Sequence, residues 1–130
     1  MSKPKVLIIG DSCIDRYISC RVDRICPEGP VPVAVPIEVN ETSGMAGNVY
    51  ENALRYNELV LNDRYDIHFV TNEETVIKTR YVDSKTQQLI LRVDEGDSDV
   101  LDIPFDVLNK IMQDDWDGVL VSDYDKGFLH

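Results

Sequence analysis

The sequence predicts an α/β core that carries a separate small β-sheet. Residues 6–9 are a continuous apolar run that ends at Gly10-Asp11, which is typical of a strand buried in a parallel sheet. Residues 46–57 place apolar side chains at helical spacing. Residues 75–93 alternate as an antiparallel hairpin does. The predicted order is therefore strand, β-rich excursion, helix, more β, helix and strand.

The elements after the first strand follow from local signals. A more polar second strand is expected at 17–22, and residues 26–30 form a loop because their prolines cannot extend a ladder. Residues 31–39 resume β character, and Pro32 and Pro36 within them indicate an edge strand or a bulge.

The first helix is expected to start at Thr42-Ser43-Gly44, with a hydroxyl as its N-cap, and to run through about Asn57. Short strands are expected at 59–61 and 67–70, followed by hairpin strands at 75–82 and 87–93. Pro104 marks a second helix, because proline is well suited to a first turn. Its expected buried stripe consists of Phe105, Leu108, Ile111 and Met112, and the last buried strand is 119–121.

Length and charge limit the function. The 130 residues fit one domain, 1–130, of ordinary size. With 13 basic against 24 acidic residues, the net charge is −11. Nucleic acids and anionic membrane surfaces favour proteins with a positive charge, so neither is an expected partner of this acidic chain.

The cysteines indicate the compartment. The chain has an odd number of cysteines, and none of them forms a C-x-x-C motif: Cys13, Cys20 and Cys26. This pattern supports neither a disulfide framework nor a metal site. Three partly buried thiols are expected in a reducing compartment. With no signal peptide and no apolar run long enough for a membrane helix, we expect a cytoplasmic protein.

Two groups of residues near strand and helix ends are candidates for a site. Asp11 and Asp15 follow the first strand, where an acid could hold sugar hydroxyls or a cation, although capping of the following turn is favoured by position alone. Gly44, Gly47 and Asn48 lie at the expected helix start, where small residues let ligand oxygens approach backbone N–H groups. A plain cap and turn is the commoner explanation of such glycines.

The hairpin gathers basic residues. Lys78, Arg80, Lys85 and Arg92 are four of the 13 in the chain, and Lys78 and Arg80 project from the same strand face. A paired basic face suits a phosphate ester. The pattern alone nevertheless favours a solvated strand face balanced by nearby acids.

Five segments resemble the motifs of one protein family, in the family's order. Residues 6–17 resemble its opening strand, and residues 24–33 (R-I-C-P-E-G-P-V-P-V) are similar to its R-I-S-P-E-A-P-V-P-V stretch. Residues 43–49 (S-G-M-A-G-N-V) are similar to its P-G-G-A-A-N-V segment. Residues 78–94 resemble its K-x-R-V…Q-Q-L-x-R-x-D hairpin, and residues 121–127 resemble its L-S-D-Y-x-K-G strand end. Together these segments resemble the ribokinase-like (PfkB) sugar kinases, and most closely the heptose 7-phosphate kinase domain of bifunctional ADP-heptose synthases.

The resemblance implies a partial three-layer core with a β-sheet lid made from about 17–39 and 75–94. It implies a homodimer through that lid and a sugar phosphate between lid and core. Asp15 matches the acid that holds sugar hydroxyls. Gly44 and Asn48 match the residues at the sugar-binding helix start. Four weaker matches line the same cleft or its phosphate end: Lys78, Arg80, Gln87 and Lys126.

The departures from the family are as informative as the matches. Only residues 58–66 fill an interval where the family has a further α/β unit, and Met45 replaces the second glycine of a pair. No segment matches the G-A-G-D motif, which supplies the catalytic base and anion hole in the family. We therefore predict no catalytic residue and no metal site in this chain, with ATP and Mg²⁺ expected only if the other half is supplied.

Three hypotheses remain at this point. The chain is a kinase-like sugar-phosphate module that does not phosphorylate alone. Alternatively, it is the sugar-binding half of an active kinase completed by another chain or by further sequence. As a third possibility, it is a structural or protein-interaction module.

Overall fold

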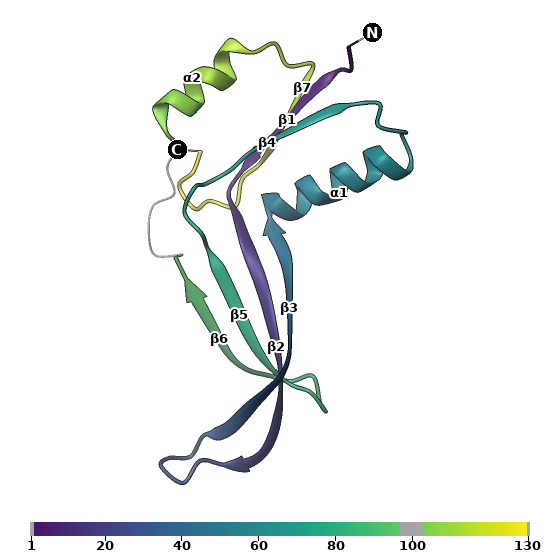
Figure 1. Cartoon of the computed structure of the whole chain (residues 1–130). Helices are drawn as coiled ribbons and strands as arrows, with labels where there is room; N and C mark the ends of the chain where they lie inside the picture. The colour runs from purple at the N-terminus through teal and green to yellow at the C-terminus, as the bar shows by residue number, and fades with distance from the viewer. Residues whose placement is uncertain (1, 97–102, 130) are drawn as a thin grey trace.

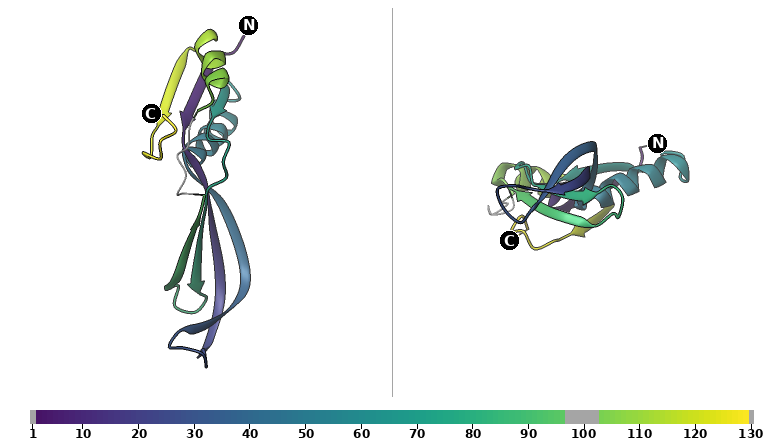
Figure 2. Two further views of the ribbon diagram at one scale, coloured as in Figure 1. Left: turned by 90° about the vertical axis from the view of Figure 1, so that its left-hand side faces the viewer. Right: turned by 90° about the horizontal axis from the view of Figure 1, so that it is seen from below.

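A computed structural model describes residues 2–96 and 103–129 and shows two sheets arranged end to end (Figures 1 and 2). The core sheet is parallel, with the order β4-β1-β7. The second sheet, called the lid sheet below, has the order β3-β2-β5-β6. The core strands are β1 (Lys5–Gly10), β4 (Asp66–Val70) and β7 (Gly118–Ser122).

Helices cover the core sheet on both faces. Helix α1 (Ala46–Leu59) lies on the face of Ile8 and Phe69, where Tyr50 stacks on Phe69 with ring centroids 4.6 Å apart. Helix α2 (Phe105–Gln113) lies on the opposite face, tied by a hydrogen bond of 2.9 Å from Trp116 Nε1 to the Ile111 carbonyl. The predicted α/β class and buried first strand are confirmed.

The lid sheet is built on one long strand. β2 (Ser12–Ile25) pairs antiparallel with β3 (Pro32–Met45) and parallel with β5 (Ile77–Asp83). β5 pairs antiparallel with β6 (Leu89–Glu95), which confirms the predicted hairpin. β3 is an edge strand whose register shifts beside Pro36, as its prolines indicated. Both β2 and β3 are longer than the expected 17–22 and 31–39.

Asp11 lies between the two sheets and is fully buried. Its Oδ1 and Oδ2 accept hydrogen bonds from the N–H groups of Tyr124 (2.8 Å) and Lys126 (2.9 Å), and its carbonyl accepts the Ala46 N–H (2.9 Å). Asp11 therefore caps the loop after β7 rather than the turn that follows it in sequence.

The expected start of the first helix is wrong. Thr42, Ser43 and Gly44 belong to β3, and α1 begins at Ala46 without a side-chain cap. The Ser43 hydroxyl donates to Glu51 Oε1 instead (2.6 Å). Pairing with β2 extends the strand through these residues, and the buried Asp11 carbonyl takes the first helical N–H.

The strand expected at 59–61 is also wrong. Leu59 ends α1, and the N–H groups of Val60 and Leu61 both bond to the Tyr56 carbonyl. Asn57 holds the returning chain, since its Nδ2 donates to the Tyr65 carbonyl (2.8 Å) and its Oδ1 accepts the Tyr65 N–H (3.1 Å). Residues 60–65 thus connect α1 directly to β4.

The buried α2 stripe and the buried last strand are likewise corrected. Phe105 and Met112 are each 76% exposed and Leu108 is 37% exposed, whereas Ile111 is partly buried and packs against the core cluster. β7 is an edge strand with exposed apolar side chains. Apolar pattern predicted the elements correctly, but the layer that would cover them is missing from the described residues.

Candidate functional site

Three of the sequence-predicted site residues lie together on one face of the lid sheet. Asp15 is the register partner of Lys78, and Tyr17 is that of Arg80, so these side chains share a face. Arg80 Nη1 donates to Asp15 Oδ1 at 2.9 Å, and both side chains are 24% exposed. The Arg80 guanidinium also lies 5.3 Å from the Tyr17 ring centroid. The resulting ion pair remains reachable from solvent.

Gly44 makes room for this carboxylate. It pairs with Cys13 across the β2–β3 ladder. A Cβ added at Gly44 would lie 2.5 Å from both Asp15 Oδ2 and Cys13 Sγ. The glycine is therefore required by close packing within the sheet, not by a helix start as the sequence suggested.

Strand β6 adds a second ion pair beside the first. Arg92 and Asp94 are the register partners of Arg80 and Lys78. Arg92 holds Asp94 through Nε–Oδ1 (2.8 Å) and Nη2–Oδ2 (3.0 Å). These bonds are the main reason that the pKa of Asp94 is lowered. Burial raises this pKa by a lesser amount, and the charges of Arg92, Lys78 and Arg80 each lower it further. Neither Tyr17 nor Asp94 was predicted as a site residue, although the alternation of β2 and β6 could have placed both.

Lys78 lies near the core end of β5, and Val76, two residues before it, belongs to the same buried cluster as Phe128. Lys78 Nζ lies 4.0 Å from Met45 Sδ, and Met45 packs on the buried cluster that contains Phe128. Lys126 lies two residues before Phe128, and its backbone N–H is fixed by Asp11. The loop that carries Lys126 therefore packs against the base of the lid sheet.

The other two predicted residues lie apart from the ion pairs. Asn48 is exposed in the first turn of α1, next to the buried Ala46 and Gly47. Gln87 lies in the β5–β6 turn, beyond the end of β5 that is farther from Lys78, and its Nε2 donates to the Ser84 carbonyl (3.0 Å). The structure does not bring Gln87 to Asp15.

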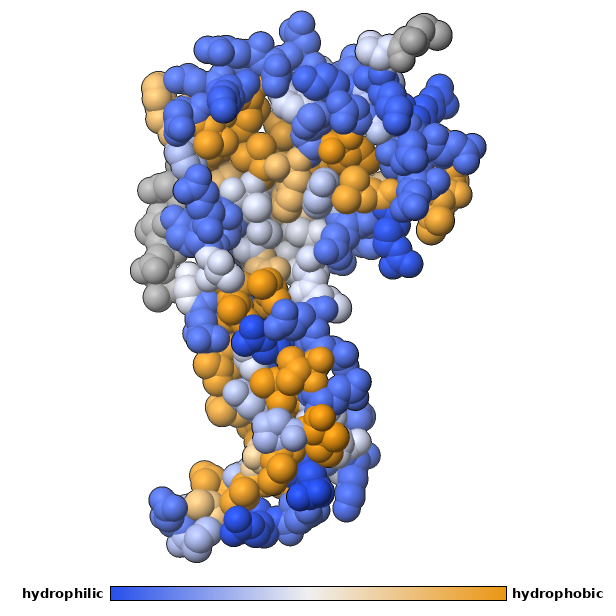
Figure 3. Space-filling model, in the orientation of Figure 1, coloured by the Kyte–Doolittle hydropathy of each residue, from blue (hydrophilic) through white to orange (hydrophobic). Residues whose placement is uncertain are grey.

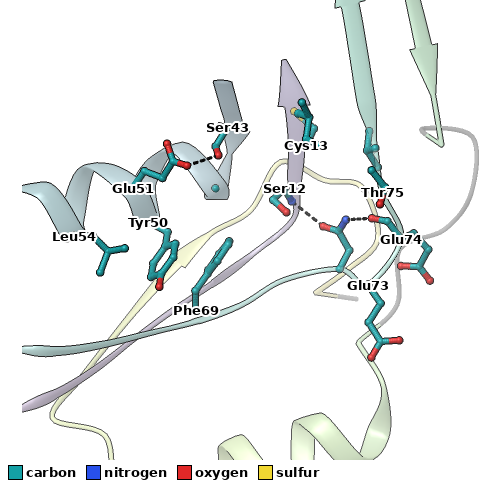
Figure 4. A pocket seen from close by; sticks show the side chains of 14 residues that line it. Ser12, Cys13, Ser43, Tyr50, Glu51, Leu54, Phe69, Glu73, Glu74 and Thr75 are labelled. Carbon is teal, nitrogen blue, oxygen red and sulfur yellow. Dashed lines mark hydrogen bonds between the residues drawn. The ribbon is translucent and has the colours of Figure 1, made fainter. Parts of the chain in front are cut away.

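A cavity of about 450 Å³ lies on the α1 side, between the start of α1 and residues 72–76 (Figure 4). Ile14 and Ser43 line it; they alternate with Asp15 and Gly44 and so belong to the opposite sheet face. Glu51, Glu73 and Glu74 line it too, and this negative charge opposes a phosphate ester.

The buried side-chain amide of Asn72 stabilises one wall of this cavity. Sequence patterns did not indicate this role. Asn72 Oδ1 accepts the Ser12 N–H (2.7 Å), and its Nδ2 donates to the Glu74 carbonyl (2.6 Å) (Figure 4). Asn72 thereby ties the β4–β5 connection to the start of β2.

The described ranges 2–96 and 103–129 contain neither a candidate metal site nor a candidate membrane helix. No group of three His, Cys, Asp or Glu residues is arranged to hold a metal ion there. No helix in this part of the chain is long and apolar enough to cross a membrane.

Comparisons with known proteins place the chain beside large bifunctional proteins. It is 32% identical to the bifunctional protein HldE of Nitratiruptor sp. over 98% of the chain, but over only 32% of that relative. The HldE of Helicobacter hepaticus is 32% identical over 98% of the chain and 31% of its own length. The chain is a partial homologue of the HldE proteins. It spans about a third of the length of these relatives.

No family model matches the sequence. Solved structures with a similar arrangement include a carbohydrate kinase from Agrobacterium tumefaciens, at a TM-score of 0.48 and 15% identity over 91% of this chain and 45% of that one. Another is ribokinase from Thermotoga maritima, at a TM-score of 0.40 and 15% identity over 89% and 51%. The predicted resemblance to a bifunctional protein is confirmed by the similarity to the HldE proteins, over about a third of their length.

Proposed function

We propose that the chain binds a sugar phosphate on the polar face of the lid sheet. The observation that carries the proposal is the Asp15–Arg80 ion pair with Lys78 alongside, set against the space left by Gly44. A carboxylate accepts hydrogen bonds from sugar hydroxyls, whereas an arginine fork and a lysine charge suit a phosphate ester. The acidic cavity on the α1 side lacks that complementarity.

The geometry leaves binding capacity on both members of the ion pair. Arg80 uses Nη1 for Asp15, and a guanidinium has five N–H donors in all. Asp15 accepts through Oδ1, while its Oδ2 faces Gly44. A ligand can therefore bind without breaking the pair, which supports Asp15, Gly44, Lys78 and Arg80 as the centre of the site. Lys126, on the loop after β7, is the candidate on the core side, whereas Asn48 and Gln87 lie apart from the ion pairs.

Calorimetric titration with heptose 7-phosphate, the unphosphorylated heptose and inorganic phosphate tests this site. Asp15→Asn and Arg80→Gln should each weaken binding of the sugar phosphate about tenfold to a hundredfold, the usual value of hydrogen bonds to charged groups. Asp23→Asn is the matched control, because Asp23 forms an exposed ion pair with Arg21 on the same strand. Unchanged affinity in both site variants would refute the assignment.

We further propose that this chain does not transfer a phosphoryl group alone. No G-A-G-D segment occurs in the 130 residues, and phosphoryl transfer depends on positioning and charge stabilisation by such groups. The chain mixed with ATP, Mg²⁺ and heptose 7-phosphate should release no ADP above background. Turnover would instead favour the alternative, an active sugar kinase, for which further sequence or another chain would otherwise supply the ATP and Mg²⁺ site.

The opposite face of the lid sheet supports a homodimer. Val39, Leu91 and Val93 on that face are exposed, and Figure 3 shows apolar side chains gathered along the sheet. An exposed apolar face of this kind favours association with a second copy. Light scattering should give the mass of a dimer, and Leu91→Lys should give a monomer, while Leu59→Lys at the exposed end of α1 leaves the dimer intact. A wild-type monomer at high concentration would contradict a homodimer formed through the lid sheet.

A further inference from the structure

Met45 has a backbone conformation that residues with a side chain rarely adopt. It ends β3 and precedes α1 at the junction of the two sheets (Figure 1), with φ of 55° and ψ of −132°. This region suits glycine, and a residue as bulky as methionine is strained there. Such strain persists only where the surrounding structure enforces it, and it is concentrated at functional sites.

The neighbours of Met45 in the chain are fixed on both sides. Gly44 packs against the Asp15 carboxylate across the ladder. The N–H of Ala46, which is fully buried, bonds to the Asp11 carbonyl (2.9 Å). The backbone of Met45 therefore absorbs the whole change of direction from strand to helix.

This conformation places the Met45 side chain on the polar face of the lid sheet. Ser43, two residues earlier in β3, lines the cavity on the α1 side, and strand alternation would place residue 45 there too. The Met45 sulfur lies instead 4.0 Å from Lys78 Nζ, and Lys78 shares its sheet face with Asp15. Met45 also packs on the buried cluster that contains Phe128. The strained backbone thus holds a bulky side chain against the ammonium group of Lys78.

The contact restricts what Lys78 can bind. Its ammonium group has three N–H donors, and its register partners on the two neighbouring strands are Asp15 and Asp94. A thioether sulfur is only a weak acceptor, so Met45 occupies space beside the ammonium group without replacing an oxygen ligand. A phosphate oxygen that approaches Lys78 from the junction has to displace the Met45 side chain.

We propose that Met45 sets the selectivity of this site by limiting the access of a phosphate group to Lys78. This role rests on the proposed sugar-phosphate site and determines how strongly that site recognises the phosphate. Asp15 and Arg80 bind the ligand in the wild-type chain, whereas Lys78 contributes fully only when the side chain at position 45 is small. The effect of Met45 is therefore confined to phosphorylated ligands.

Substitutions at Met45 test the proposal by calorimetric titration with heptose 7-phosphate and with the unphosphorylated heptose. Met45→Ala and Met45→Gly both uncover Lys78, and only glycine also relieves the positive φ. Each should raise the affinity for heptose 7-phosphate about tenfold, the value of one additional hydrogen bond to a charged group. The affinity for unphosphorylated heptose should change less than about twofold. Met45→Leu keeps the bulk and should match the wild-type chain, as should Met112→Ala at an exposed methionine of α2.

Two further measurements assign the effect to Lys78. In a Lys78→Met background, Met45→Ala should no longer change the affinity, whereas in a Lys85→Met background the gain should be retained. Acetylation with acetic anhydride, followed by peptide mass spectrometry, reports the access to each lysine without any sugar. Lys78 should react faster in Met45→Ala than in the wild-type chain, while the exposed Lys85 reacts equally in both. Circular dichroism establishes that each variant is folded, and Met45→Gly replaces Met45→Ala if the alanine variant is not.

The outcomes separate this role of Met45 from the proposed function. A gain that is specific for heptose 7-phosphate, requires Lys78 and accompanies faster acetylation supports the proposal. Equal gains for both ligands, unchanged acetylation of Lys78, or unchanged affinity in a chain that binds heptose 7-phosphate would overturn it and leave the site itself intact. If neither the wild-type chain nor any variant binds heptose 7-phosphate, the proposed function fails and the selectivity role fails with it.

Discussion

The core sheet and the lid sheet are joined by the segment that runs from β1 into β2, yet their side chains differ in exposure to solvent. In the core, Leu7 and Ile8 are each 1% exposed between two helices. In the lid, Asp15, Lys78 and Arg80 stay partly exposed, and neither described helix covers the face that carries them. Stability should therefore depend mainly on the core and its junction, whereas ligand recognition should depend on the lid.

The largest effect is expected at Asp11, where the two sheets join. Asp11→Ala removes a fully buried carboxylate and leaves the N–H groups of Tyr124 and Lys126 without their acceptor, which should lower the free energy of unfolding by about 3 kcal/mol. Urea denaturation measures the loss. Asp123→Ala, in the same loop but exposed, should cost less than about 0.5 kcal/mol. Equal losses in the two variants would show that the junction is not the determinant of stability.

A smaller loss is expected at Gly44, where the lid meets the junction. The Cβ of Gly44→Ala would meet Asp15 Oδ2 and Cys13 Sγ, so overpacking should cost about 1–3 kcal/mol and displace the Asp15 carboxylate. The affinity of this variant for the sugar phosphate should fall as well, because Asp15 is displaced. Gly29→Ala has open space around the added carbon and serves as the control for both measurements. Normal stability and binding in the Gly44 variant would contradict the packing described here.

Sequence patterns predicted the elements whose signals are local. The apolar run at 6–9 identified β1, the alternation at 75–93 identified the hairpin, and the prolines of β3 identified an edge. In the site, spacing placed Lys78 and Arg80 on one strand face, and the structure agrees. These inferences needed only neighbours within a few residues.

The errors concern partners far away in the chain. Asp11 bonds to residues 113 and 115 positions later, which no local pattern encodes. The glycine at 44 suggested a helix start, but its role comes from the Asp15 side chain across a ladder. Apolar spacing predicted burial for β7 and α2, whereas burial also requires a covering layer.

A further prediction separates stability from binding within the lid. The Asp15–Arg80 pair is partly solvated, so a double-mutant cycle of Asp15→Asn and Arg80→Gln should give a coupling energy of about 1 kcal/mol or less in unfolding. The same variants are expected to reduce sugar-phosphate affinity strongly. A coupling energy comparable to the loss at Asp11 would mean that the lid pair is a structural element, and the division between the sheets would fail.

The smallest expected effect is a pH dependence of the lid. Arg92 lowers the pKa of Asp94, so the folded state favours the ionised carboxylate. This contribution is fully present above the ordinary Asp pKa of about 4 and is lost as the pH falls through the lower folded value. NMR titration of Asp94 should show the lowered pKa, and Arg92→Gln should return it toward the ordinary range. Because Lys78 and Arg80 act on Asp94 in the same direction, Arg80→Gln should raise this pKa by a smaller step. No response to Arg80→Gln would show that the two ion pairs are electrostatically separate, and the polar face would then be two independent pairs instead of one site.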